Sequence, residues 1–72
     1  MADTERVWRV RRNHTSIAAQ IRDCDAPPGA EIHYFYDGAL VYRRQWPSRE
    51  QALTDATARL RELQRAGWAT HW

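Results

Sequence analysis

The chain has 72 residues, enough for one small domain with a single core and too few for an active-site cleft between two lobes. Hydrophobic residues make up 43% of the chain and include four Trp, three Tyr and one Phe, which argues against a disordered chain. The net charge is only +2, but all eleven basic residues are Arg, whose planar fork suits phosphates and base edges.

Alternating apolar and charged residues predict a first strand over about 5–12, with Trp8 and Val10 facing one side and the intervening arginines the other. Turn-forming residues follow, and the alternation resumes over 17–23. We expect a second strand there, although residues 18–20 also fit a helical turn.

Two prolines followed by a glycine predict a surface loop over 23–29. Beyond this loop, two runs rich in aromatic and apolar residues predict strands over 31–36 and 39–46. Between them stands Asp37-Gly38, the strongest short-range signal of a β-hairpin.

The length of the hairpin loop decides which side chains share a face of the sheet. A two-residue turn would pair Tyr36 with Ala39 and mix apolar and polar residues on both faces. A three-residue loop with a left-handed Gly38 would instead pair Phe35 with Ala39. We favour the longer loop because it produces one apolar face, which contains Ile32, Tyr34, Leu40, Tyr42 and Trp46.

The C-terminal part predicts a helix over about 49–66. Ser48 can cap its first turn, and Gln51 completes the capping-box pattern. The apolar stripe of this helix consists of Ala52, Leu53, Ala56, Leu60 and Leu63. Gly67 and Trp68 fit a Schellman cap in which Trp68 contacts the end of this stripe.

These elements predict an α+β fold in which a four-stranded antiparallel sheet is packed on one face by a single C-terminal α-helix, in the order ββββα. We expect residues 1–72 to form one small domain. The tail after Gly67 ends in Trp72, which either folds back onto the sheet or protrudes.

The predicted helix covers one face of the sheet, so the other face is free. That face gathers guanidinium, amide and aromatic groups, which suit phosphate contacts and base stacking. The residues that we predict to bind nucleic acid, either DNA or RNA, are Arg9, Arg11, Arg22, Arg43, Gln20 and Phe35. The alternative is a solvated face that keeps a small domain in solution.

A second hypothesis is a protein-interaction module or a homodimer, because so short a chain has more aromatic area than one helix and one sheet readily bury. Aromatic residues are enriched at interface hot spots, and an edge strand can pair with a second copy. The aromatic residues that we expect at such an interface are Trp46, Trp72, Phe35 and Tyr36.

The sequence contains no specific catalytic, metal-ligand or cofactor motif. Cys24 lies between two aspartates and so lacks the electropositive setting of a reactive thiol, and the histidines His14, His33 and His71 have no ligand spacing. We therefore expect a non-enzymatic binding domain without a cofactor or metal.

The expected cellular location rests only on sequence features that are missing: a disulfide pair, a signal segment and a membrane-spanning run. A lone cysteine cannot form an internal disulfide, and the sequence has neither an apolar signal segment nor a run of ~18 apolar residues. We expect a cytoplasmic protein without a membrane partner.

Overall fold

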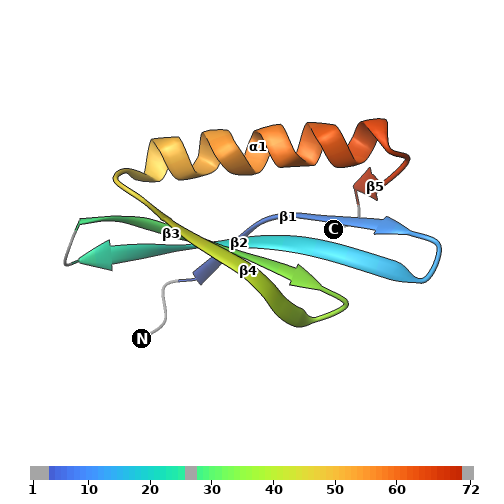
Figure 1. Ribbon diagram of the computed structural model, residues 1–72, viewed down its shortest axis with the longest axis horizontal. Coiled ribbons are helices and arrows are strands. Elements are labelled where there is room, and N and C mark those ends of the chain that lie inside the picture. The colour runs from blue at the N-terminus through green and yellow to red at the C-terminus, as the bar shows by residue number, and fades with distance from the viewer. Residues whose placement is uncertain (1–3, 26–27, 71–72) are drawn as a thin grey trace.

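The computed structural model describes residues 4–25 and 28–70 of the chain. Its elements are β1 (Thr4–Arg12), β2 (Thr15–Asp25), β3 (Pro28–Tyr36), β4 (Ala39–Trp46), α1 (Arg49–Arg65) and β5 (Ala69–Thr70). The expected α+β fold is confirmed: an antiparallel sheet of four long strands packs against a single C-terminal helix, which runs along one face of the sheet (Figure 1). The short β5 was not expected and pairs with β1, giving the strand order β4-β3-β2-β1-β5.

The second and third strands are longer than expected, because the segment expected to be a loop is largely paired. Cys24 pairs with Gly29, and Asp25 pairs with Pro28. Pro28 is tolerated because it is the first residue of β3, a position where a missing amide donor does little harm. Gly29 has a φ of +154°, and a Cβ at this position would lie 2.2 Å from the backbone oxygen of Trp46. Only glycine allows this close approach.

The connection between β3 and β4 is a two-residue turn, so the expected three-residue loop is wrong. Tyr36 pairs with Ala39, and both Asp37 (φ 50°) and Gly38 (φ 86°) have positive φ, as a type I′ turn requires. The turn is also anchored to the start of β2. Asp37 Oδ1 accepts a hydrogen bond of 2.9 Å from the backbone N–H of Ser16, and the backbone N–H of Asp37 donates to the oxygen of Ser16 at 2.9 Å.

With the two-residue turn alone, apolar and polar residues of β4 would be mixed on both faces of the sheet. A β-bulge in β4 restores the apolar face beyond Leu40. Phe35 pairs with Leu40 and Tyr34 with Tyr42, which leaves Val41 as an extra residue in β4. Tyr42 therefore faces the helix side, as expected. Leu40 does not: it lies with Phe35 on the opposite face, which corrects the prediction that these apolar residues of β4 all share one side.

The core lies between the sheet and α1. It consists of Trp8, Val10, Ala19, Ile21, Ala30, Ile32, Tyr34, Ala52 and Ala56. The two helix alanines are small enough to let α1 approach the sheet closely, while Leu53, Leu60 and Leu63 pack around the margin. The predicted apolar stripe of the helix is thereby confirmed.

Both ends of α1 have the predicted caps. At the start, Ser48 Oγ accepts a hydrogen bond of 3.2 Å from the backbone N–H of Gln51. At the end, Gly67 has a φ of +98°, and its N–H donates to the oxygen of Gln64. The N–H of Trp68 donates to the oxygen of Leu63, which completes a Schellman motif.

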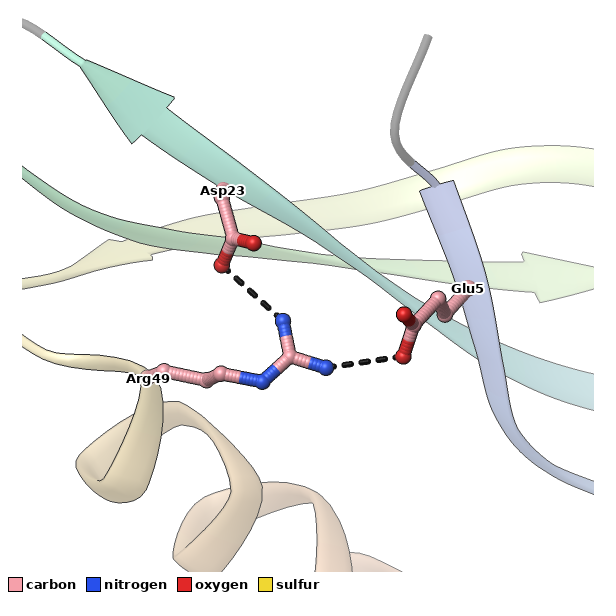
Figure 2. A network of polar contacts seen from close by, with 3 residues as sticks. All are labelled: Glu5, Asp23 and Arg49. Atoms are coloured by element: carbon pink, nitrogen blue, oxygen red, sulfur yellow. Dashed lines mark hydrogen bonds and ion pairs between the residues drawn. The ribbon is translucent and has the colours of Figure 1, made fainter.

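Arg49, in the first turn of α1, links the helix to two strands. Its Nη1 lies 2.9 Å from Oδ1 of Asp23 on β2, and its Nη2 lies 2.8 Å from Oε2 of Glu5 on β1 (Figure 2). The hydrogen bond to Asp23 is the main reason that the pKa of Arg49 is raised. The positive charge of Arg49 is therefore balanced by two carboxylates on the helix side of the sheet.

Candidate functional site

The strand register defines the outer face, which we use for the face of the sheet opposite α1. Residues directly opposite each other on neighbouring strands share a face. One row across the outer face consists of Arg9, Ala18, Phe35 and Leu40. The next consists of Arg6, Gln20, His33 and Arg43. A further row consists of Thr4, Arg22, Glu31 and Gln45, and Arg11 lies opposite Ser16 at the other end of the face.

The structure thus brings all the residues predicted to bind nucleic acid onto one face. The rows contain Arg9, Arg11, Arg22, Arg43, Gln20 and Phe35. Their shared orientation follows from the alternation of side chains along each strand, which the sequence already contained.

Arg6 also belongs to the outer face, and the sequence pattern did not place it there. Strict alternation from Trp8 puts Arg6 on the helix side. In the structure, Arg6 pairs with Gln20 and Trp8 with Ala19, so Val7 is the extra residue of a β-bulge. This irregularity turns the Arg6 side chain to the same face as Arg9.

The arginines of the outer face have few partners within the protein. In the described part of the chain, the side chains of Arg6, Arg9, Arg22 and Arg43 form neither an ion pair nor a hydrogen bond. The Nε of Arg11 donates to the backbone oxygen of Asn13 at 3.3 Å.

Arginines on the helix side are engaged instead. The guanidinium of Arg12 lies 5.0 Å from the centroid of the Trp68 ring and donates to the oxygen of Ala66. That of Arg44 lies 4.0 Å from the centroid of the Trp46 ring. A guanidinium stacked on an aromatic ring already has a favourable cation–π contact, so these two arginines are less available to a ligand than those of the outer face.

Glu31 is the one carboxylate in the rows of the outer face, and its place there was not predicted from the sequence. Its Oε1 forms a hydrogen bond with Nε2 of His33, two residues along β3. This hydrogen bond is the main reason that the pKa of Glu31 lies below its ordinary value of 4.5. The positive charges of Arg43 and Arg22 lower it further, whereas partial burial acts in the opposite direction. Glu31 is therefore ionised at neutral pH and offsets part of the positive charge.

A recess lies in the outer face where a small residue separates two large ones. Ala18 stands between Arg9 on β1 and Phe35 on β3, and its methyl group leaves space between them. The recess has a volume of about 240 Å³ and is lined by Arg6, Arg9, Ser16, Ala18, Gln20, Phe35 and Gly38.

The residues predicted for a protein interface are not gathered into one patch. Trp46 and Tyr36 lie at opposite ends of the β3–β4 hairpin, since Trp46 pairs with Ala30 near the start of β3 and Tyr36 is the last residue of β3. Phe35 lies on the outer face. Trp72 lies outside the described residues, so the structure gives no position for it.

Other kinds of site find little support in residues 4–25 and 28–70. No three His, Cys, Asp or Glu side chains of these segments converge as metal ligands would. None of their helices has the length and apolar character needed to cross a membrane.

The chain matches no protein-family model, and comparisons with curated proteins and with solved structures give no match. The geometry of the outer face therefore carries the functional argument.

Proposed function

We propose that the protein binds nucleic acid through the outer face of its sheet. The observation that supports the proposal is the excess of positive charge on the outer face. The rows of this face contain Arg6, Arg9, Arg11, Arg22 and Arg43 but a single carboxylate, that of Glu31. A face with unpaired arginines attracts a polyanion, and each phosphate that an arginine neutralises releases a counterion.

The chemistry of the neighbouring groups also suits nucleic acid. Guanidinium groups bind phosphate oxygens or base edges with two parallel hydrogen bonds, and amides such as that of Gln20 contact bases or phosphates. Phe35 provides an aromatic surface in the middle of the positive charge, on which a base can stack.

The solvent-exposed side of α1 is less suitable for a polyanion, although it has arginines too. Arg61 and Arg65 are interspersed there with Glu50 and Glu62, whereas the guanidinium of Arg59 lies 5.9 Å from the centroid of the Tyr34 ring. Neighbouring charges of opposite sign offset each other, so this side of the helix presents a weaker positive potential than the outer face. The outer face is therefore where we expect binding.

The proposal is tested by titrating labelled single-stranded and duplex oligonucleotides at several salt concentrations. With four phosphate contacts, log affinity against log salt should have a slope of about −3 to −4. Arg9→Gln/Arg43→Gln should weaken binding and flatten this slope. The matched control Arg61→Gln/Arg65→Gln removes the same charge from α1 and should bind like wild type. Absence of binding at low salt, or equal losses in both variants, would contradict the proposal.

A second candidate function is contact with another protein, and one observation favours it. Large apolar side chains are exposed around the β3–β4 hairpin: Tyr36 at 48%, Leu40 at 48%, Val41 at 63% and Tyr42 at 46%. Exposed large apolar residues on both faces of one hairpin are available for contact with a partner, and β4 is an edge strand that could pair with a second copy. Sedimentation equilibrium tests this homodimer. A monomer throughout the concentration range would exclude it, and a dimer that Val41→Glu dissociates would support it.

A further inference from the structure

The recess around Ala18 combines the surfaces that a single nucleobase needs. Phe35 forms an apolar wall on one side and Arg9 stands on the other, with the Ala18 methyl group at the base between them. The volume of about 240 Å³ is below the range of roughly 300–1,000 Å³ typical of pockets for drug-sized ligands. It suits a planar group no larger than one base.

Polar groups at the edge of the recess are available to a ligand. Within the described residues, neither the amide of Gln20 nor the hydroxyl of Ser16 forms a side-chain hydrogen bond. The backbone N–H of Ser16 is already used by Asp37, and this contact holds the hairpin turn at one end of the recess. Base edges carry donors and acceptors that such free groups can bind.

From this arrangement we infer that the ligand of the outer face is single-stranded nucleic acid, with one unstacked base seated in the Ala18 recess against Phe35. The inference rests on the proposed function and narrows it. In a duplex, both faces of each base are covered by neighbouring bases, so Phe35 could not stack on one. Single-stranded DNA and RNA share the exposed base face and the phosphates, and Arg6 and Arg9 lie beside the recess to contact the latter.

Binding by the wild-type protein provides the first test. The probes are oligothymidylate, oligouridylate, a mixed-sequence duplex, and an abasic oligodeoxynucleotide that keeps the phosphates and sugars. We expect oligothymidylate to bind about tenfold more tightly than the abasic strand, since one stacked base contributes roughly 1–3 kcal/mol. Equal affinity for these two strands would overturn the inference. Oligouridylate binding like oligothymidylate would identify both DNA and RNA as ligands, whereas a difference would identify the preferred sugar.

Variants then locate the base. Ala18→Leu fills the recess, and Phe35→Leu keeps an apolar side chain but removes the ring. Each should weaken oligothymidylate binding about tenfold while leaving abasic-strand affinity and the salt slope unchanged. The control Leu40→Ala alters the same row outside the recess lining and should bind like wild type. Circular dichroism checks that each variant is folded.

The outcomes separate this inference from the proposed function. If wild type binds no nucleic acid, the proposed function fails and the inference fails with it. If wild type binds but oligothymidylate affinity is the same in Ala18→Leu and Phe35→Leu as in wild type, only the inference fails. Should either variant not fold, the remaining variant and the abasic comparison decide.

Discussion

Trp8 donates a hydrogen bond from its indole Nε1 to the backbone oxygen of Ala56 at a distance of 2.8 Å. This bond joins the middle of β1 to the middle of α1, and the Trp8 side chain is only 1% exposed. It satisfies the one polar atom of the largest side chain in the core. By holding α1 against this side of the sheet, the contact leaves the opposite face to solvent.

Substitution of Trp8 by Phe should lower the free energy of unfolding by about 2 kcal/mol, because it removes a buried hydrogen bond and leaves unfilled volume. Trp46→Phe is the matched control. The Nε1 of Trp46 is buried without a hydrogen-bond partner among the described residues, so its removal relieves an unsatisfied donor. Urea denaturation should show a smaller loss for Trp46→Phe. Equal losses would mean that the hydrogen bond of Trp8 contributes little.

Gly29→Ala should be strongly destabilising, by about 3 kcal/mol, since its Cβ would meet the backbone oxygen of Trp46 at 2.2 Å. Gly38→Ala provides the comparison. Gly38 also has a positive φ, but a Cβ there meets nothing within 4 Å, so we expect a loss of about 1 kcal/mol from backbone strain alone. Thermal denaturation measures both. A Gly29 variant no less stable than the Gly38 variant would show that β3 and β4 can separate at this point.

Stability should fall at alkaline pH through Tyr34. Burial, followed by the charge and hydrogen bond of Asp55, raises the pKa of this tyrosine above its ordinary value of 10.0. Above pH 10 the unfolded chain releases a proton that the folded protein retains, so the free energy of unfolding falls as pH rises toward the folded pKa. Between pH 10 and 11 the loss should be about 1 kcal/mol. Tyr34→Phe should lack this component, and an identical alkaline loss in the variant would contradict the assignment.

Glu31 should weaken binding of nucleic acid, because its carboxylate lies among the arginines of the outer face. Glu31→Gln removes the charge and should tighten binding about two- to fivefold at moderate salt. Glu50→Gln makes the same charge change on α1 and should have little effect. Fluorescence anisotropy compares the two variants, and a tighter complex in both would indicate a general effect of net charge.

The same carboxylate should contribute to acid sensitivity. Because the pKa of Glu31 is lowered in the folded protein, its stabilising contribution is present above its ordinary value of 4.5 and is lost as pH falls through the folded pKa. Glu31→Gln should therefore lose stability at pH 7 and vary less with pH in the acid range. Urea melts at pH 3 and pH 7 measure this difference. A variant with the same acid dependence as wild type would assign the effect to other carboxylates.

Much of the fold could be predicted because its signals are local. Ser48 and Gly67 mark the two ends of α1 through the hydrogen bonds that their positions allow. The alternation around Trp8 and Ala19 places Arg9, Arg11 and Arg22 correctly on the outer face. These patterns depend on neighbouring residues in the sequence, so no knowledge of the tertiary structure was needed.

What could not be predicted depends on contacts between distant segments. The bulges at Val7 and Val41 have no sequence signature, yet the first turns Arg6 to the outer face and the second returns Tyr42 to the helix side. The recess could not be predicted either, because Ala18 lies between its two large neighbours only when β2 is paired with both β1 and β3.

The most direct test of binding at the outer face is an amide chemical-shift map of the protein with and without oligothymidylate. We predict that shifts concentrate on β1, β2 and β3 around Arg9, Ala18 and Phe35, while the exposed side of α1 around Arg61 is unchanged. Shifts that centre on the amides of α1 or on those around Val41, with the amides near Ala18 unaffected, would contradict binding at the outer face.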